Sequence, residues 1–566
     1  MRGEDSRGAK AGQWGRAAEV EALAKLAESL EQGQGLRSVA KEIGVARSTL
    51  RHWRARKERI DEDPAVVALF ESPSGLAWLH RLVLASVFVF GKVGPCGAPM
   101  LSAFLRLSGI GRFVASSVGS VHKVSTAISD QIIDFGEQER GRLAAEMPER
   151  QIAVALDENF HQAVCLVAME PASGFILCEQ VEENREAATW DAAMAKACKG
   201  LRVTVAVGGS DEAAALKQHI AKTLGAVHAP DLFHQQRELW RAMEPALGRS
   251  LKAPERALPA AESALQYWQD RHAKHLVGDR GPGRPPQFER HIAEATAVLE
   301  ARRADLKEAA DRQAKAHEAI RSISQVYHPV DLTTGAIRTA SSMESSLATA
   351  FATLQETADA LGLDVRQRAR LQKAQRLTPK MVSHLAFFWH HIDRCLDGLP
   401  LPEAAAALAR EALIPGLYLK SVAARARTAD QRGQLRQLSA TLLSGADDLT
   451  GALLALPPTV LSDLRGLAAD AVHLFLRATS CVEGRNGRLA LLQHGSRFLG
   501  TKRRRALTVL HNFAIHRPDG STPASRFFRQ PHRALFAFLL DHLDLPLRPR
   551  PSASHASALT RGWANL

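Results

Sequence analysis

Three acidic residues that lie far apart in the sequence have the type and setting that phosphodiester chemistry needs. Asp157 ends an apolar run, Asp211 follows a second apolar run and the glycine pair 208–209, and Glu483 lies in the polar segment 480–486. Cleavage of a phosphodiester requires a deprotonated nucleophile and a stabilised leaving oxygen, and two Mg²⁺ ions about 4 Å apart can provide both. Carboxylate oxygens are the hard ligands that Mg²⁺ prefers. We therefore interpret the three acids as one cluster that binds two Mg²⁺ ions, with Mn²⁺ able to substitute.

The elements that must position these acids form an α/β pattern over residues 149–245, completed by residues 471–545. Strands are expected at 151–157, 162–169, 174–180, 201–207 and 226–228, and helices at about 185–198, at about 211–224 and from 231 onward. This β-β-β-α-β-α-β-α order is that of an RNase H-like domain, a mixed sheet flanked by helices. In such a domain Asp157 ends the central strand, Asp211 lies just past the neighbouring strand, and Glu483 comes from a later helix at the sheet edge.

Each acid also has an ordinary explanation. An Asp at a strand end is most often a turn or cap residue, Asp211 can N-cap the helix that follows it, and Glu483 can be a helix-surface acid. The joint occurrence of the acids and the strand order favours the metal cluster.

A further polar pair lies in Asp231-Leu-Phe-His234. In a helix, positions 231 and 234 share a face. His234 is therefore a candidate catalytic residue that contacts the scissile phosphate or steadies a metal-bound carboxylate. The alternative is a helix cap next to a buried histidine.

Length and charge describe a multidomain chain with a polyanion as a plausible partner. At 566 residues, about three or four domains are expected, and 46% hydrophobic with 23% charged residues is the composition of a folded protein. The net charge is +13, and this suits nucleic acid without identifying it.

Cysteine spacing and apolar stretches exclude some classes of protein. None of the six cysteines has C-x-x-C spacing, so a zinc site is not expected, and their scatter is typical of reduced thiols. The N-terminus lacks the apolar region of a signal peptide, and the longest apolar stretch, residues 82–90, is too short to span a bilayer. A cytoplasmic protein is expected.

Residues 1–61 have the pattern of a helix-turn-helix DNA-binding domain. Helices are expected at about 16–32 and at 36–43, and a third begins after Ser48 as N-cap, with Gly44 in a tight turn. The third helix buries Leu50 and Trp53. Its outward residues, candidates for contacts in a DNA major groove, are Arg47, Thr49, Arg51, His52, Arg54 and Arg56. The alternative is a three-helix bundle with a solvated basic face.

The remaining segments are mainly helical. Residues 62–148 are apolar and suit packing or dimerisation, and residues 246–470 form a large all-helical insertion before the last acid. Within the insertion, the charged amphipathic stretch 289–321 predicts an antiparallel hairpin arm or a dimer contact. The tail 546–566 is expected to be disordered.

Several motifs spread over residues 65–550 resemble one known family. They are Val93-Gly-Pro-Cys-Gly97, Arg112-Phe-Val-Ala-Ser-Ser117, Leu156-Asp-Glu-Asn-Phe160, Ser210-Asp-Glu-Ala213, Pro230-Asp-Leu-Phe-His234, Gly281-Pro-Gly-Arg-Pro-Pro286, Tyr327-His-Pro329, Ser480-Cys-Val-Glu-Gly-Arg-Asn-Gly487, Leu507-Thr-Val-Leu-His-Asn512, Asp519-Gly-Ser-Thr522 and Arg526-Phe-Phe528. The chain thereby resembles bacterial insertion-sequence transposases of the DDE type. The closest resemblance is to a group whose C-terminal half was catalogued as a domain of unknown function.

The resemblance implies a Mg²⁺-dependent transposase with an RNase H-like core and a helical insertion before the last acid. Asp157, Asp211 and Glu483 fall on the positions of the catalytic and metal-binding triad, and Asp231-x-x-His234 looks like the D-x-x-H element of related transposases. Such an enzyme cuts DNA and transfers a 3′-hydroxyl of the insertion sequence to target DNA. It works in the bacterial cytoplasm, bound to the nucleoid, as a homodimer or larger assembly on double-stranded DNA.

Basic residues near the third acid fit DNA in that role. Arg485, Asn486 and Arg488 follow Glu483 by about one turn and are candidates for phosphate contacts. The run Lys502, Arg503, Arg504 and Arg505 adds backbone affinity, in a region (477–550) with 14 Lys or Arg against 4 Asp or Glu. The alternative for this run is a solvated helix face.

Two other functions stay open at this point. One is a catalytically inactive or repurposed transposase-derived protein that binds DNA without cutting it. The other is an RNase H-like nuclease that cuts DNA but does not join it.

Overall fold

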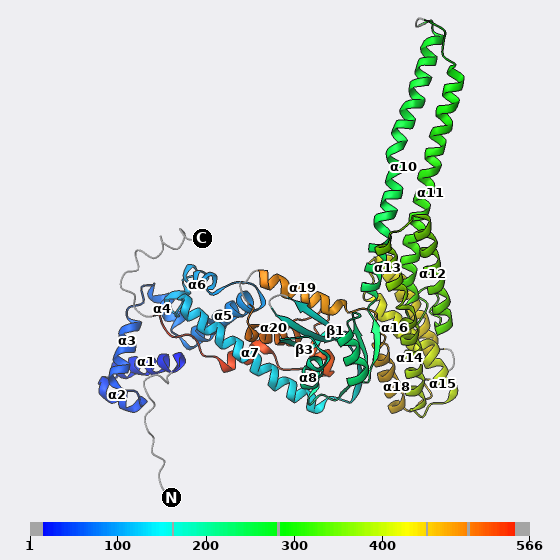
Figure 1. Cartoon of the computed structure of the whole chain (residues 1–566). Helices are drawn as coiled ribbons and strands as arrows, with labels where there is room; N and C mark the ends of the chain where they lie inside the picture. The colour runs from blue at the N-terminus through cyan, green and yellow to red at the C-terminus, as the bar shows by residue number, and fades with distance from the viewer. Residues whose placement is uncertain (1–14, 161–162, 280–282, 449–450, 495–498, 550–566) are drawn as a thin grey trace. The chain divides into compact units, whose positions relative to one another are not determined.

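The computed structural model describes residues 15–160, 163–279, 283–448, 451–494 and 499–549, and within them the chain is mainly helical with one five-stranded sheet (Figure 1). It divides into two compact units. Unit 1 contains Met1–Pro148, Ser173–Val181 and Asn486–Leu566, and unit 2 contains Glu149–Ala172 and Glu182–Arg485. The expected multidomain, mainly helical organisation is confirmed.

Unit 1 begins with three short helices, α1 (Arg16–Glu31), α2 (Leu36–Ile43) and α3 (Arg47–Lys57). They pack around a small apolar core made of Ala22, Leu23, Leu26, Val39, Ala40, Val45, Leu50 and Trp53. Gly44 has φ +74°, a left-handed conformation that glycine adopts without steric cost, so the predicted tight turn is confirmed.

One detail of these helices was predicted wrongly. Ser48 does not cap α3, because the helix already begins at Arg47, and its N-cap Ala46 has no side chain that can accept a hydrogen bond.

Most of the rest of unit 1 is helical, as predicted for 62–148. Its elements are α4 (Pro64–Phe70), α5 (Pro73–Ser86), the π-helix η1 (Val87–Val93), α6 (Ala98–Leu107), the 3₁₀ turn η2 (Ile110–Arg112), α7 (Val118–Glu146), α20 (Thr501–Ala514), α21 (Pro523–Phe528) and α22 (Leu535–His542).

Strand β3 (Phe175–Glu182) belongs largely to unit 1 because the C-terminal helices bind it. The Asn512 side chain accepts from the Ile176 backbone N–H at 2.9 Å and donates to the Ile176 carbonyl at 3.0 Å. The Phe175 ring also stacks on Phe527 at 4.4 Å between centroids. These contacts satisfy the backbone N–H and C=O of Ile176 and bury the Phe175 ring.

Helices α5 and η1 form one continuous stretch, Pro73–Val93, of 21 residues, and an 18-residue window within it has a mean hydropathy of 1.5. It is the one helix in the described residues whose length and composition would allow it to cross a membrane, and a single helix of this kind is weak evidence for a span. Leu79, Val83, Leu84 and Val87 on this stretch are buried within the protein. A core helix of a folded domain meets the same length and composition test.

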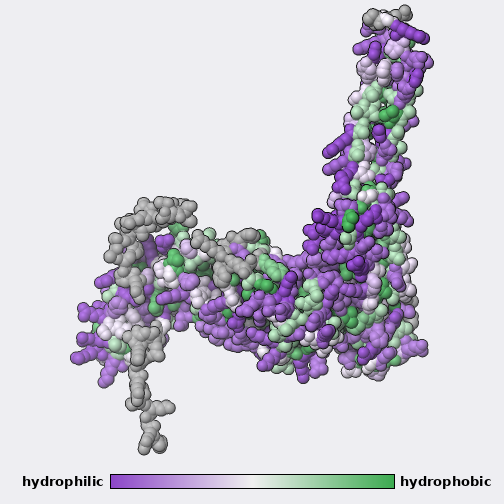
Figure 2. All heavy atoms as spheres, viewed as in Figure 1, coloured by the Kyte–Doolittle hydropathy of each residue, from purple (hydrophilic) through white to green (hydrophobic). Residues whose placement is uncertain are grey.

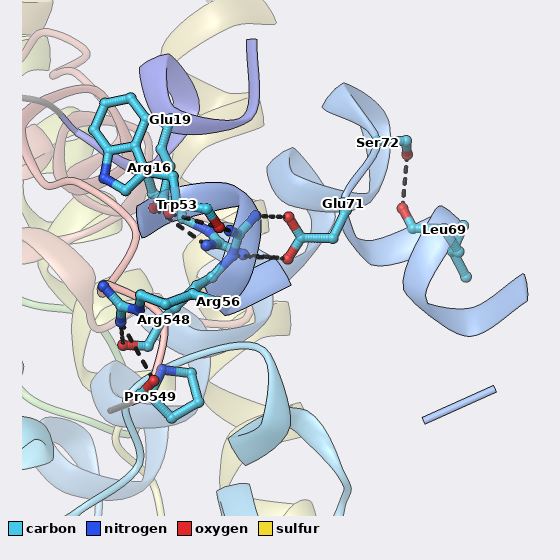
Figure 3. A network of polar contacts seen from close by, with 9 residues as sticks. All are labelled: Arg16, Glu19, Trp53, Arg56, Leu69, Glu71, Ser72, Arg548 and Pro549. Atoms are coloured by element: carbon cyan, nitrogen blue, oxygen red, sulfur yellow. Dashed lines mark hydrogen bonds and ion pairs between the residues drawn. The ribbon is translucent and has the colours of Figure 1, made fainter. Parts of the chain in front are cut away.

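A buried ionic network joins the C-terminal segment to the first helices (Figure 3). Glu71 accepts hydrogen bonds from the guanidinium groups of both Arg16 and Arg548. Arg548 Nη1 also lies 3.1 Å from Glu19 Oε1, and the Arg16 guanidinium lies 3.3 Å from the same carboxylate. The disordered tail predicted from residue 546 is therefore wrong for its first residues, because Arg548 is buried and paired. Residues 550–566 lie outside the described part of the chain.

Unit 2 holds most of the sheet. The strands β1 (Arg150–Phe160), β2 (Val164–Glu170), β4 (Val203–Ser210) and β5 (Val227–Pro230) join β3 in the order β3-β2-β1-β4-β5. β1 pairs antiparallel with β2 and parallel with β4, and β4 pairs parallel with β5. The crossovers contain α8 (Ala187–Cys198) and α9 (Ala214–Gln218) with the π-helix η3 (His219–Thr223). The predicted order of strands and helices is the observed one.

The helical part of unit 2 includes a two-helix arm, α10 (Leu232–Leu276) and α11 (Phe288–Val326), visible as the long projection in Figure 1. The hairpin arm expected from residues 289–321 is thus present. Its visible face is mainly hydrophilic, with apolar side chains between the two helices (Figure 2). Helix α10 runs without a break across the predicted domain boundary at 245/246, through Pro245.

The helices after the arm surround one large apolar core. They are α12 (Ala340–Ala360), α13 (Val365–Gln375), α14 (Thr378–Asp397), α15 (Glu403–Leu408), the π-helix η4 (Ala409–Leu413), α16 (Ile414–Ala423), α17 (Ala429–Asp448) and α18 (Pro458–Ala471), followed by α19 (Ser480–His494).

Candidate metal centre

Asp157 lies on the central strand β1, with Val167 of β2 opposite it. The prediction that it ends the strand is wrong, since β1 continues to Phe160. However, Ala155 is the last residue of β1 that pairs with β4. Asp157 therefore lies beyond the paired part of β1 on the side that faces β4.

Asp211 is the first residue after β4, as predicted. Its Oδ1 accepts the backbone N–H of Ala213 at 3.0 Å, which forms a short turn. The N-cap of the next helix is Ala213, so the alternative in which Asp211 caps that helix is wrong. Among the described residues no hydrogen bond to Asp211 Oδ2 is present.

Asp231 is the N-cap of α10, which confirms the alternative that this residue caps a helix. Its Oδ1 accepts from Phe233 N at 2.8 Å. Its Oδ2 accepts from His234 Nδ1 at 2.9 Å and from the Thr479 hydroxyl. Burial alone would raise the pKa of Asp231, but the hydrogen bonds from His234 and Thr479 lower it below its ordinary value. Asp231 is therefore an ionised carboxylate with both oxygens engaged.

His234 is half-buried, with 30% of its side chain exposed, rather than buried as the alternative supposed. The hydrogen bond to Asp231 raises the pKa of His234, more than burial lowers it. Since Nδ1 is held by Asp231, Nε2 is the ring nitrogen left to face a ligand.

Glu483 lies in the first turn of α19, and its backbone N–H donates to the Thr479 carbonyl at 3.3 Å. Side-chain donor atoms of Asp231, His234 and Glu483 all lie within 4.8 Å of one another. Residues separated by about 250 positions thus meet at one place within unit 2.

Asp157 and Asp211 belong to the same electrostatic cluster. Burial first, and then the nearby carboxylates of Asp211 and Glu483, raise the pKa of Asp157 to about 6, while a hydrogen bond from the Glu158 backbone and the charge of His234 oppose the rise. Burial and the Asp231 carboxylate likewise raise the pKa of Glu483. The three predicted acids and His234 therefore lie close enough to interact.

The direction of these shifts distinguishes the cluster from structural acids elsewhere in the chain. Arg142 and Arg533 lower the pKa of buried Glu139 to about 2, against the effect of burial. At Asp157, by contrast, burial and the neighbouring carboxylates outweigh the opposing charge of His234. Concentrated carboxylate charge of this kind is stabilised by a bound cation.

The donor set fits a hard divalent cation. Asp157, Asp211 and Glu483 could supply carboxylate oxygens, which suit Mg²⁺ and Mn²⁺. Asp231 fits a supporting role better, because its oxygens already accept three hydrogen bonds and orient His234.

The linker before α19 holds two parts of the site together. The Arg477 carbonyl accepts the backbone N–H of Leu232, at the start of α10, at 2.9 Å. Leu476 packs so closely on β4 that a Cβ on Gly209 would lie 2.3 Å from its Cδ2. The glycine at the end of β4 therefore permits the close approach of the segment that leads to Glu483.

Thr479 is a functional candidate that the sequence did not reveal. Its hydroxyl binds Asp231 and its carbonyl begins α19, so it fixes the distance between Asp231 and Glu483. No sequence motif predicts such a long-range hydrogen bond. Only the position of Thr479, directly before the motif that begins at Ser480, could have pointed to it.

Thr479→Val is expected to weaken divalent-cation binding about tenfold, since loss of a supporting hydrogen bond typically costs that much. Thr479→Ser keeps the hydroxyl and should restore wild-type affinity. Calorimetric titration with Mn²⁺ measures both. Equal affinity in the Val and Ser variants would show that the hydroxyl does not position the site.

The candidate DNA-binding residues of α3 are mostly accessible. Arg47, Arg51, His52 and Arg54 are exposed and Thr49 is half-buried, although Arg54 also pairs with Glu58 at 3.2 Å. Arg56, expected to point outward, instead donates to the Arg548 carbonyl at 2.7 Å (Figure 3).

The basic residues after Glu483 are less available than predicted. Arg485 is only 4% exposed, so its expected phosphate contact is wrong for the structure as it stands. Asn486 and Arg488 are half-buried further along α19.

The run Lys502–Arg505 at the start of α20 is partly structural. Lys502 pairs with Asp130, and Arg505 pairs with Glu137 at 2.6 Å, both acids lying on α7. Arg503 and Arg504 are half-buried. Both pairs are half-exposed, so they cost little to break and leave the run available to a polyanion.

Lys92 is buried beside this run and donates to Ser125 and Ser129 at 2.7 Å each. Burial, and then the charges of Arg503 and Lys502, lower its pKa to about 8. Because the folded-state pKa lies below the unfolded one, the charged ammonium destabilises the fold below pH 8, and stability rises between about pH 8 and 10.5.

Lys92→Met is therefore expected to stabilise α7 by roughly 1–3 kcal/mol at pH 7 and to remove that rise with pH. Hydrogen exchange of α7 amides at pH 7 and pH 9.5 provides the measurement. The exposed Lys123→Met on α7 is the control and should change neither quantity. If the wild-type protein were equally stable at both pH values, the lowered pKa of Lys92 would be contradicted.

Comparison with known proteins gives one partial match. Residues 409–555 match the model of a family of unknown function, DUF6399. This stretch includes Glu483, Thr479 and the basic run of α20. A comparison with curated proteins finds no match.

Proposed function

We propose that the chain is a DDE-type transposase that catalyses Mg²⁺-dependent cleavage of DNA strands and 3′-hydroxyl strand transfer. The observation that carries the proposal is the meeting of Asp231, His234 and Glu483 within unit 2, with side-chain ligand atoms within 4.8 Å of one another, beside Asp157, whose pKa responds to the charges of Asp211, His234 and Glu483. Four separated segments contribute to it, and no other group of His, Cys, Asp and Glu side chains among the described residues has ligand atoms gathered as closely as those around Glu483.

The topology supports an RNase H-like assignment for the core. The order β3-β2-β1-β4-β5, with only β2 antiparallel to the central β1 among the strands of unit 2, is the arrangement expected of that fold. In open sheets with parallel strands, ligands bind beyond the carboxyl ends of the strands. Asp157 and Asp211 lie at that end of β1 and β4.

The N-terminal helices suit a helix-turn-helix role. Helix α3 presents Arg47, Arg51 and His52 to solvent, and side chains of these types reach base edges and phosphates in a major groove. The net charge of +13 favours double-stranded DNA as the partner. A homodimer or larger assembly in the bacterial cytoplasm would bring two element ends together.

In this mechanism the carboxylates of Asp157, Asp211 and Glu483 would hold two Mg²⁺ ions. Bound there, the ions would lower the pKa of the attacking hydroxyl and stabilise the leaving oxygen. Asp231 fixes the tautomer of His234, so that Nε2 can donate a hydrogen bond to a phosphate oxygen once the ring is protonated. Thr479 maintains the spacing between Asp231 and Glu483.

The test uses a DNA fragment that carries the ends of the encoding element. Wild-type protein with Mg²⁺ or Mn²⁺ should release 3′-hydroxyl ends and join them to a target plasmid, and chelation should abolish both reactions. Cutting without joining would indicate a nuclease. Binding without cutting in either metal would indicate a repurposed DNA-binding protein.

A further inference from the structure

The first turns of α10 present an exposed aromatic ring next to the acidic cluster. Phe233 lies between the cap residue Asp231 and His234, and 45% of it is exposed. Its ring is perpendicular to that of His234, with 5.7 Å between centroids. A large apolar ring at the rim of a charged site is costly to leave in water unless a ligand covers it.

Arg237 lies one turn further along the same face. Its guanidinium carbon is 5.9 Å from the centroid of the Phe233 ring. Its Nε is buried and has no hydrogen-bond partner in the described part of the chain. The adjacent acid Glu238 does not neutralise it, because Glu238 pairs with Arg370 at 3.1 Å and with Lys373 at 3.8 Å.

Arg237 also interacts with the acidic cluster, since its charge opposes the overall rise in the pKa of both His234 and Glu483. It therefore combines an unsatisfied N–H, a nearby exposed ring and a position beside the site. Guanidinium groups bind phosphate oxygens through directed hydrogen bonds, and aromatic rings stack on the faces of bases.

We propose that Phe233 and Arg237 form a nucleotide subsite, in which Phe233 stacks on an unpaired base and Arg237 binds the adjoining phosphate. Inside a duplex both faces of a base are covered by its neighbours, so a protein ring can stack only on a base that is frayed, flipped or single-stranded. The subsite thus selects DNA that is opened next to the reacting phosphate. The inference rests on the proposed function in taking nucleic acid as the ligand.

The test compares two fluorescent DNAs, a blunt duplex and the same duplex with a short 3′ overhang. Anisotropy titrations with Ca²⁺ in place of Mg²⁺ measure binding without cleavage. Wild type should bind the overhang duplex roughly tenfold more tightly, since stacking of one base has about that effect. Contacts made elsewhere to the duplex are common to both DNAs and cancel in the ratio.

Phe233→Ala is expected to abolish the preference for the overhang, and Phe233→Trp should retain it. Tyr267→Ala is the matched control, because Tyr267 is another exposed aromatic residue on α10, 53% exposed, but lies out along the arm. Retention of the preference in Phe233→Ala, or an equal loss in Tyr267→Ala, would overturn the proposal.

Arg237→Gln should weaken the salt dependence of overhang binding. The slope of the logarithm of the binding constant against the logarithm of the salt concentration should fall in magnitude by about one, the amount for one phosphate contact. The exposed Arg241→Gln, one turn further on, should leave the ratio between the two DNAs unchanged. An Arg237→Gln protein with wild-type ratio and slope would overturn the phosphate assignment.

Failure of the subsite and failure of the enzyme give different results. If Phe233 determines the overhang preference but Mg²⁺ supports no cutting, the subsite stands and the transposase proposal falls. If wild type cuts DNA but shows no overhang preference, the enzyme stands and the subsite falls.

Discussion

Glu483→Gln is expected to reduce Mg²⁺-dependent DNA cleavage by at least about 10³-fold, a loss of roughly 4 kcal/mol in transition-state stabilisation. The substitution keeps the size of the side chain and removes its charge. Asp157→Asn and Asp211→Asn should have effects of the same order. Rates are measured as single-turnover cleavage of labelled DNA, so that product release does not contribute.

The control for this series is Glu344→Gln, an exposed acid on α12 outside the cluster, which should cut at the wild-type rate. DNA affinity in Ca²⁺ should stay within a few-fold of wild type in all four variants. If the three cluster variants lost folding and DNA binding together, the acids would be structural and the metal-centre interpretation would fail.

Glu71→Gln is expected to destabilise the N-terminal part of unit 1 by about 3–5 kcal/mol, the cost of breaking a buried ion pair. Glu71 is 5% exposed and bridges Arg16 and Arg548. Without its charge, two buried guanidinium groups face each other with only Glu19 to compensate them (Figure 3). Hydrogen exchange of α1 and α3 amides measures the change.

Glu62→Gln is the matched control for Glu71, since Glu62 pairs with Arg112 at 2.7 Å in a partly exposed setting. Exposed pairs typically contribute 0–1 kcal/mol, so this change should be small. Equal effects of the two substitutions would mean that burial of the network adds nothing to its strength.

Local signals in the sequence predicted the elements well. Helix α2 has the predicted bounds and α1 ends within one residue of its predicted end, because apolar spacing and glycine punctuation determine short helices. The strand order along the chain was readable for the same reason. The continuity of α10 through Pro245 was not predicted; it depends on the buried side chains on both sides of the proline, Ala242, Met243, Ala246 and Leu247.

Long-range contacts could not be predicted in the same way. Nothing local indicates that Asn512 binds β3, that Thr479 binds Asp231, or that Arg548 is buried against Glu71. The acids at 157, 211 and 483 were identified by residue type and by their positions relative to strands, and the structure brings them together. Their catalytic role stays a prediction. Arg485 was misassigned because basic residues in a helix were taken as accessible.

The central claim, that acids from three distant segments bind metal at one centre, is tested most directly by Mn²⁺ binding. Electron paramagnetic resonance can count Mn²⁺ bound to the full chain, with Glu344→Gln as the unchanged control. The account predicts two bound ions per wild-type chain and the loss of at least one in Glu483→Gln, in Asp157→Asn and in Asp211→Asn. Wild-type Mn²⁺ binding in all three variants would contradict it.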